Sequence, residues 1–306
     1  MIGYLFLFIA ILAGVAKGYC GKKTSEYVNG ITDGLILQIL RLILCVLIGL
    51  CIFAFSKEQS QIDGIVLLIA LLNGIANAIF LLSWIFSIKS GAYLFVDICL
   101  TTGGILIPCI GGHLFFKNTI TPLQYIGIII MLIAVLVMNG YNSSVTNNKT
   151  SFLNTILLVC VAISNGIMGF CEKLFAYYTS NNAIHCGLSV FTLLTFAFGT
   201  IVLLIALSLV CKRNKIKIKS CFQSFAFKKI GIYLILISAF LFFNTYLTTM
   251  TNTHINNTVL IYPLKFGSNL ILSAVMASVV FKEKMNWRSV LGITLIISSI
   301  LFINIL

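Results

Sequence analysis

The chain has 306 residues, of which 60% are hydrophobic and only 9% are charged, and its mean hydropathy is +1.10. A soluble domain is about 45–50% apolar and about 25% charged, so no water-soluble fold of this length could bury so much apolar surface. The formal net charge of +13 would suit a nucleic-acid-binding protein, but the basic residues lie in short segments between apolar runs and no base-stacking motif accompanies them. We therefore expect a membrane protein in contact with lipid and no nucleic-acid partner.

Ten mostly apolar runs follow one another along the chain, each close to the roughly 20 residues that a helix needs to cross a bilayer. Backbone groups in lipid must be satisfied within the chain, and these runs are continuous rather than alternating, so we expect helices and not a barrel. In chain order the predicted helices cover Ile2–Tyr19, Leu35–Phe55, Ile65–Ile88, Gly91–Phe116, Leu123–Gly140, Phe152–Tyr177, Ala183–Cys211, Ile230–Met250, Thr258–Phe281 and Ser289–Leu306.

The polar segments between these runs, such as Tyr141–Thr150 and Lys212–Lys229, are too short to hold a soluble domain. The ten cysteines form no CxxC pair, and most lie inside apolar runs, which argues against a disulfide framework or a zinc site. We also find no nucleophile or metal motif of an enzyme. The sequence therefore predicts a non-enzymatic protein without cofactor or metal, which acts within or across the bilayer.

The second half of the chain repeats features of the first half. Four matches occur in the same order and at corresponding places in their runs, which makes them much stronger together than each is alone. The matched pairs are Gly18-Tyr-Cys-Gly-Lys-Lys23 with Gly169-Phe-Cys-Glu-Lys-Leu174, Phe116-Lys-Asn-Thr119 with Phe281-Lys-Glu-Lys284, Gly127 with Gly292, and Asn139 with Asn304.

Five helices are repeated, and because five is odd the second set must cross the membrane in the opposite sense. Inverted repeats of this kind are typical of secondary transporters, which alternate between two conformations around a site at the repeat interface. We therefore predict an all-α integral membrane protein with ten transmembrane helices as two inverted five-helix repeats. The repeats would cover residues 1–140 and 152–306, with a linker loop at 141–151.

With these features the chain resembles the drug/metabolite transporter superfamily, of the ten-helix EamA type. The likeness rests on the repeat, on Tyr262-Pro-Leu-Lys-Phe-Gly-Ser-Asn269, and on Phe281, Glu283 and Gly292, which fit a Phe-x-Glu turn followed by a glycine that opens the last helix. Asn118 stands in place of the Glu in the first half, which departs from the pattern. The resemblance implies a multi-pass carrier of the cytoplasmic membrane for metabolites such as amino acids, sugars or nucleosides, either proton-coupled or facilitative.

Orientation in the membrane is predicted by the distribution of Lys and Arg, which concentrate in cytoplasmic loops. Loops after odd-numbered helices carry fourteen of these residues, and loops after even-numbered helices carry two, Lys57 and Lys117. The rule places both termini outside, whereas the family resemblance implies termini in the cytoplasm. We favour the charge rule because it rests on this sequence.

Ionisable and amide side chains inside the apolar runs are the first candidates for a binding site. Lys265 follows Pro263, and Asn269 and Ser273 share its helix face. We expect Lys265 and Asn269 to bind a substrate carboxylate or phosphate in a cavity, with Pro263 and Gly267 weakening the helix as in discontinuous transporter helices. The alternative is a lysine that snorkels to the interface.

Two carboxylates are candidates for proton coupling. Asp97 is the clearest acid within an apolar run, and at membrane depth it could carry a proton or bind a substrate amine, or else form a structural pair with Lys265. Glu172 either gates and couples transport or forms an ion pair near the interface, and we favour the ion pair. For Lys17 we favour snorkelling over a site role, and for Arg41 we favour an anchor at the interface.

Amide and aromatic residues complete the predicted site. Asn77 and Asn244 could hydrogen-bond a solute under an aromatic roof that includes Trp84, although such amides also join helices to one another. Tyr262 is included because the repeat places it opposite Asp97. The first, third, fourth, sixth, eighth and ninth helices would line the cavity.

The sequence therefore predicts a secondary transporter that moves a small polar metabolite across the cytoplasmic membrane by alternating access. The mixture of cation and acid favours an amino-acid-like zwitterion, with proton coupling left open. One alternative is a multidrug or lipid-linked-sugar exporter of the same fold, in which Lys265 would be dispensable. Another is a membrane helper subunit that transports nothing. Substrate, direction and oligomeric state are left open.

Overall fold

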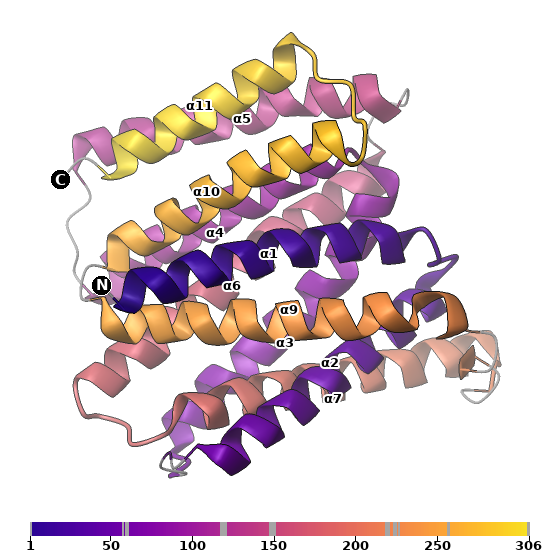
Figure 1. Cartoon of the computed structure of the whole chain (residues 1–306), viewed down its shortest axis with the longest axis vertical. Helices are drawn as coiled ribbons and strands as arrows, with labels where there is room; N and C mark the ends of the chain where they lie inside the picture. The colour runs from indigo at the N-terminus through magenta and orange to yellow at the C-terminus, as the bar shows by residue number, and fades with distance from the viewer. Residues whose placement is uncertain are drawn as a thin grey trace.

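The computed structural model describes residues 2–56, 58, 61–116, 121–146, 151–217, 221–222, 225, 227–255 and 258–304. Asn118, in the segment 117–120 of the predicted repeat, and residues 147–150 of the predicted linker lie outside the described residues. Within the described residues the chain forms ten helices (Figure 1): α1 (Ile2–Ser25), α2 (Ile31–Phe55), α3 (Gly64–Ser90), α4 (Tyr93–Phe116), α5 (Pro122–Thr146), α6 (Phe152–Ser180), α7 (Leu188–Asn214), α9 (Phe227–His254), α10 (Thr258–Val279) and α11 (Trp287–Asn304).

Eight of these helices are long and apolar enough to span a membrane, and α11 adds a shorter apolar segment, Trp287–Ile303. The outer surface carries many exposed large hydrophobic side chains, for example Phe8 on α1, Leu136 on α5 and Ile205 on α7. A soluble protein rarely exposes contiguous apolar area of this kind, whereas a lipid-facing surface requires it. The prediction of an all-helical, multi-pass membrane protein is confirmed.

The helix boundaries differ from the expected ones where polar residues continue a helix or glycine begins one. The first helix runs on to Ser25, and α5 runs on to Thr146 into the predicted linker, because helix geometry does not stop at the end of the apolar run. The seventh begins at Leu188 instead of Ala183, with Gly187 as its N-cap. The ninth helix, α10, continues through Pro263 without interruption. The expectation of a discontinuous helix at this place is therefore wrong.

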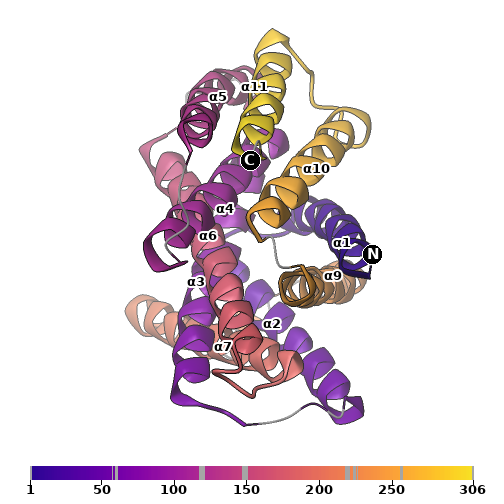
Figure 2. The ribbon, with the colours of Figure 1, turned by 90° about the vertical axis from the view of Figure 1, so that its left-hand side faces the viewer.

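The helices pack in pairs that join the two halves of the chain. The closest pairs are α1 with α9, α3 and α4 with α6, α2 with α7, and α5 with α11. The α5–α11 pair lies at one edge of the molecule and the α2–α7 pair at the other, with the remaining helices between them (Figures 1 and 2). If each helix is exchanged for its counterpart in the other half, the pairing pattern is largely preserved, as a twofold repeat would require. The inverted repeat itself stays a prediction.

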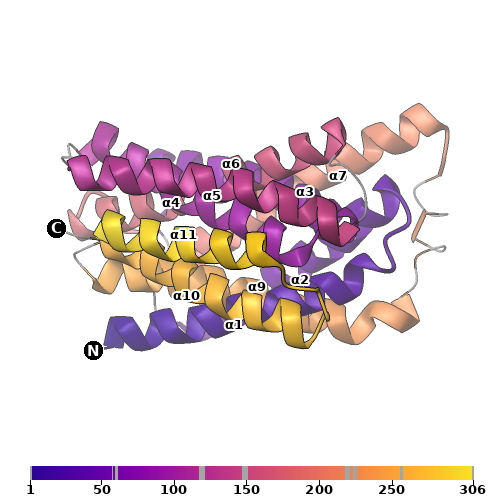
Figure 3. The same ribbon diagram turned by 90° about the horizontal axis from the view of Figure 1, so that it is seen from above.

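The bundle has two distinct ends. The start of α1 and the end of α11 lie together at one end, which we call the termini end (Figures 1 and 3). At the opposite end α1, α3, α7 and α10 finish and α4 and α11 begin, and this end carries basic side chains that include Lys22, Lys89, Arg213 and Arg288. We call it the basic end. The first, third, fifth, seventh and ninth helices of the chain end here, and the charge rule assigns this side to the cytoplasm.

Glycines bring α4 and α6 into close contact beside the centre of the bundle. A Cβ atom added to Gly103 would lie 1.8 Å from the backbone oxygen of Ala162, and one added to Gly166 would lie 2.4 Å from the backbone oxygen of Gly103. Backbones can approach this closely only where side chains are absent, as in other membrane helix pairs. Gly103 and Gly166 therefore allow α4 and α6 to pack backbone against backbone.

Candidate functional site

Two small adjacent cavities lie in the middle of the bundle, with volumes of about 40 and about 20 Å³. The larger one lies toward the basic end and the smaller toward the termini end, and we call them the basic-end lobe and the termini-end lobe. They share five lining residues: Lys17, Asn165, Asn244, Lys265 and Phe266. Ligand pockets usually enclose about 300–1,000 Å³, so this conformation has room for water but is closed around the site.

Together the two lobes are lined by six helices, α1, α3, α4, α6, α9 and α10, of which α4 contributes to the basic-end lobe alone. These are the first, third, fourth, sixth, eighth and ninth helices of the chain, so the prediction of the cavity-lining helices is confirmed. They line a cavity because polar side chains interrupt their apolar faces at the same depth in the bundle. The outer pairs α2–α7 and α5–α11 contribute no lining residue to these two lobes.

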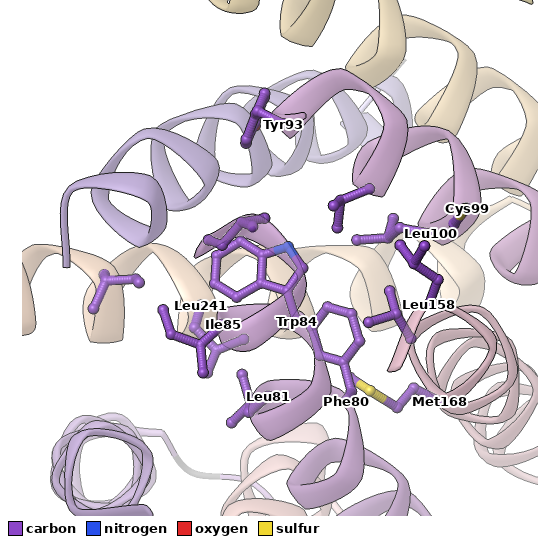
Figure 4. Packing of buried hydrophobic residues seen from close by; sticks show 14 of the residues in the cluster. Phe80, Leu81, Trp84, Ile85, Tyr93, Cys99, Leu100, Leu158, Met168 and Leu241 are labelled. Carbon is purple, nitrogen blue, oxygen red and sulfur yellow. The ribbon is translucent and has the colours of Figure 1, made fainter. Parts of the chain in front are cut away.

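Lys17 of α1 points into the bundle. Its ammonium lies 5.4 Å from the ring centroid of Phe80 and 5.8 Å from that of Trp84, and it lines both lobes. Figure 4 shows Phe80 and Trp84 next to each other on α3 within this packed region. The expectation that Lys17 snorkels to the interface is therefore wrong, because the two rings offer the cation a favourable contact inside the bundle.

Asp97 of α4 lies in the wall of the basic-end lobe. Ser273 lines the same wall, and its hydroxyl lies 3.5 Å from the Tyr93 hydroxyl. Among the described residues, the buried Oδ2 atom of Asp97 has no hydrogen-bond partner. No ion pair within 4.0 Å joins Asp97 to Lys265 in the part of the chain that the structure describes, so the structural pair considered above is not formed in this conformation.

Lys265 and Asn269 of α10 both lie in the same wall. Lys265 is 6% exposed, and its ammonium lies 5.3 Å from the ring centroid of Phe266 on the same helix. This burial contradicts the snorkelling alternative. The amide oxygen of Asn269 is buried without a hydrogen-bond partner. Neither Lys17 nor Lys265 has a hydrogen-bond acceptor for its ammonium among the described residues, so both cations face the cavity unpaired.

Glu172 and Tyr262 lie in the termini-end lobe. Glu172 is buried within the bundle, so the ion pair near the interface that we favoured is wrong. The Tyr262 hydroxyl donates to the backbone oxygen of Gly169 at 2.5 Å and accepts from the Asn252 amide at 3.0 Å. Tyr262 therefore joins α10 to α6 and α9 while it lines the cavity.

The predicted amides separate into two groups. Asn244 lines both lobes and also donates to the backbone oxygen of Ala10 at 2.7 Å, so it joins α9 to α1 beside the cavity. Asn77 lines neither lobe, and both of its side-chain polar atoms are buried without a hydrogen-bond partner. The structure thus brings together seven of the eight predicted site residues and leaves Asn77 outside.

Arg41 of α2 is 0% exposed, so its expected place at the membrane interface is wrong. Its guanidinium carbon lies 5.4 Å from the Trp84 ring centroid, and its Nη1 donates to the Gln38 side-chain oxygen at 3.3 Å. Nε and Nη2 have no hydrogen-bond partner. A buried cation without a carboxylate partner lowers the stability of the fold. The need for an apolar membrane-spanning segment does not explain why an arginine occupies this position.

Comparison with known proteins agrees with this architecture. The model of the EamA-like transporter family matches residues 152–305, which is half of the chain. This protein belongs to the EamA-like transporter family. Such EamA-type chains form part of the drug/metabolite transporter superfamily named above, and the ten helices fit that assignment.

A solved structure titled "Crystal structure of protein" is similar to this EamA-like chain with a TM-score of 0.64. The two sequences are 12% identical, and the similarity covers 99% of this chain and 96% of the other. At this identity the likeness shows the fold alone, and it includes both halves of the chain. No curated protein matches the sequence.

At the basic end of this EamA-like transporter, the Phe-x-Glu turn at Phe281–Glu283 lies against the start of α4. The Glu283 carboxylate accepts from the backbone amides of Tyr93 at 2.7 Å and Leu94 at 3.4 Å, and from the Tyr141 hydroxyl at 3.3 Å. Phe281 packs against Tyr93 with ring centroids 5.0 Å apart. A carboxylate at a helix N-terminus is favourable because it meets free amides and the positive end of the helix dipole. The motif therefore holds α4 against the α10–α11 connection.

Three cavity residues were missed or misjudged from the sequence of this EamA-like chain. Tyr93 lies at the start of its helix, and nothing in the local sequence marks it as a cavity residue. Its hydroxyl packs against Gly18, where an added Cβ would lie 2.0 Å from the hydroxyl oxygen. Asn165, whose amide donates to the backbone oxygen of Leu100 at 3.0 Å, shares a helix stripe with Glu172 and could have been found there. Lys17 was misjudged because it lies near the end of its apolar run, although its side chain lines both lobes inside the bundle.

Proposed function

We propose that this protein is a secondary transporter that carries a small zwitterionic metabolite, such as an amino acid, across the membrane by alternating access. The family supports a membrane transporter of the drug/metabolite type. The observation that carries the finer proposal is the set of unpaired groups facing the basic-end lobe. Two ammonium groups, those of Lys17 and Lys265, face two buried acceptors without partners, Asp97 Oδ2 and Asn269 Oδ1.

A zwitterion satisfies both sets of groups at once. Its carboxylate would bind between Lys17 and Lys265, and its ammonium would donate to Asp97 and Asn269. Burying charges stabilises a complex only when each charge finds a partner, which explains why an amino acid suits this wall better than a neutral solute. The closed cavity in this structure would open alternately to the basic end and to the termini end, carrying the bound solute across.

Proton coupling is part of the proposal and is assigned to Asp97 and Glu172, one carboxylate in each lobe. A carboxylate in the membrane interior is costly when charged and unpaired, so it can take up a proton from one side and release it on the other as its access changes. Lys17 lines both lobes and so connects the lobe that holds Asp97 with the lobe that holds Glu172.

The test uses purified protein in liposomes that contain a pH-sensitive dye. Amino acids, nucleosides, sugars and drug-like cations are added one at a time, and proton movement is recorded for the original chain and for Asp97→Asn. We expect an amino acid to move protons in the original chain and Asp97→Asn to abolish this movement. Silence with every amino acid, in both the dye assay and radiolabelled counterflow, would contradict the proposed substrate class and would favour a helper protein that transports nothing.

The runner-up function is a multidrug or lipid-linked-sugar exporter of the same fold. A bulky apolar substrate would bind against aromatic side chains and would have no use for Lys265. Lys265→Met separates the two functions, because it should leave drug export intact and should abolish amino-acid transport. The polar wall and the small cavity favour the amino-acid carrier.

A further inference from the structure

Arg41 is a charged group of the central bundle that the proposed mechanism does not use. It sits on α2, which contributes no side chain to either lobe, and it is fully buried. Among the described residues, its Nε and Nη2 atoms and the neighbouring Gln38 Nε2 have no hydrogen-bond partner. Effective penalties for burying an unpaired ion reach several kcal/mol, so the fold alone would favour an apolar residue at this position.

Arg41 contacts the lining of the basic-end lobe through the indole of Trp84. Trp84 contacts both side chains: its ring centroid is 5.4 Å from the Arg41 guanidinium carbon and 5.8 Å from the Lys17 ammonium. Trp84 fits a notch at Gly21, where an added Cβ would lie 2.0 Å from the ring. Its place is therefore fixed by packing, and both cations are held near the same corner of the basic-end lobe.

Arg41 also acts on the cavity through its charge. Because Arg41 and Lys17 contact the same Trp84 ring, their two positive charges lie close together. Arg41 has no carboxylate within 4.0 Å among the described residues, so its field is not cancelled locally. Low dielectric inside the bundle lets such a field reach farther than it would in water. The corner at Lys17 and Trp84 is therefore strongly positive although only one of its two cations touches the cavity.

We infer that Arg41 is a specificity-determining residue, which makes the Lys17–Trp84 corner of the basic-end lobe a subsite for the anionic end of the substrate. The subsite takes a carboxylate, and it repels amines that lack one. This inference rests on the proposed function and deepens it, because it fixes the orientation of the zwitterion. The carboxylate lies at Lys17, toward Arg41, and the amine lies toward Asp97.

The experiment uses the fluorescence of Trp84 in a background in which the second tryptophan of the chain, the exposed Trp287, is replaced by Phe. The purified protein is titrated with three related probes: an amino acid, the amine left after removal of its carboxylate, and the carboxylate left after removal of its amine. Arg41→Met removes the charge and Arg41→Lys restores it. Arg213→Met, at the exposed end of α7, is the matched control that also removes one positive charge from the chain.

We expect Arg41→Met to weaken binding of the amino acid and of the carboxylate about tenfold, which corresponds to about 1.4 kcal/mol, and to leave amine binding unchanged or stronger. Its thermal stability should be equal to or above that of the original chain, because a buried unpaired charge is lost. Arg41→Lys should restore most of the affinity, and Arg213→Met should change nothing. In the flux assay Arg41→Met should raise KM about tenfold with kcat nearly unchanged.

Equal weakening for all three probes together with a lower melting temperature would overturn the inference, since it would assign Arg41 a structural role only. Unchanged amino-acid affinity in Arg41→Met would overturn it as well. In both cases amino-acid flux in the original chain would leave the proposed function standing. Absence of flux for every amino acid would overturn the proposed function first, and the inference with it.

Discussion

The two ends of the cavity are closed by different chemistry. At the basic end the Glu283 carboxylate binds the first amides of α4, and the Lys22 ammonium donates to the backbone oxygen of Ile88 at 2.6 Å. At the termini end the closure is neutral and consists of the Tyr262 hydroxyl between Gly169 and Asn252. Hydrogen bonds with one charged partner are roughly twice as strong as neutral ones. The basic end is therefore the more firmly closed of the two, and opening toward the termini end should be easier.

A second carboxylate provides an internal comparison. Glu58 accepts from the backbone amide of Ser189 at 2.8 Å and from its hydroxyl at 2.5 Å, at the first turn of α7. It has the same chemistry as Glu283 and lies at the termini end, but α7 does not line the cavity. The same type of helix cap thus occurs once on a cavity helix and once on an outer helix. Only the first should control access.

The largest effect is expected at Lys265, one of the two cations that line both lobes. Lys265→Met should reduce amino-acid flux by about 100-fold, because truncating one partner of a buried, hydrogen-bonded charge pair costs about 2–5 kcal/mol. The measurement is radiolabelled uptake into proteoliposomes. Lys215→Met, at the exposed end of α7, is the control and should transport normally. Normal amino-acid flux in Lys265→Met would contradict the assignment of Lys265 to the carboxylate site.

The second-largest effect is expected for Glu283→Gln, which tests the closure at the basic end of the cavity. Glu283→Gln should weaken the closure at the basic end by about 1.5–3 kcal/mol, the usual contribution of a hydrogen bond to a charged group. The closed-to-open ratio would then fall about 10- to 100-fold. With Trp287 replaced by Phe, acrylamide quenching of Trp84 reports this opening, because Trp84 is 3% exposed in the closed conformation. We expect strong quenching in Glu283→Gln.

Glu58→Gln is the matched control for that experiment. It should lower thermal stability, because α7 loses the same kind of cap, and it should leave Trp84 quenching unchanged. Equal quenching in the two variants would show that a general loosening of the bundle, and not the Phe-x-Glu turn, governs access to the cavity.

The architecture could be predicted from the sequence because lipid imposes one strong rule on every segment. An apolar run of about 20 residues in a bilayer has to become a helix, so the runs from Ile2 to the end of the chain predicted ten helices. Ends of helices were less predictable, since Ser25 and Thr146 continue a helix beyond its apolar part. Nothing in the local sequence marks where helix geometry stops in the polar region outside the hydrocarbon.

The site was predicted less evenly, for a reason that is also physical. Asp97, Glu172 and Lys265 were found because a charge at membrane depth is costly and stands out in an apolar run. Lys17 and Arg41 were assigned to the interface because their depth was judged from distance to the helix end. Their true surroundings depend on Trp84, which belongs to another helix, and such long-range packing is invisible in a single run.

The smallest effect is expected at the neutral closure, and it also decides between two roles of Tyr262. Tyr262→Phe removes the hydroxyl that bonds Gly169 and Asn252, so it should weaken the termini-end closure by about 1 kcal/mol and change the closed-to-open ratio about fivefold. Trp84 quenching should rise, but by less than in Glu283→Gln, and KM for the amino acid should change little. Tyr233→Phe, on α9 and outside both lobes, is the control. A tenfold higher KM with unchanged quenching would instead make Tyr262 a substrate ligand, as the sequence predicts, and would leave the termini end without its closing bond.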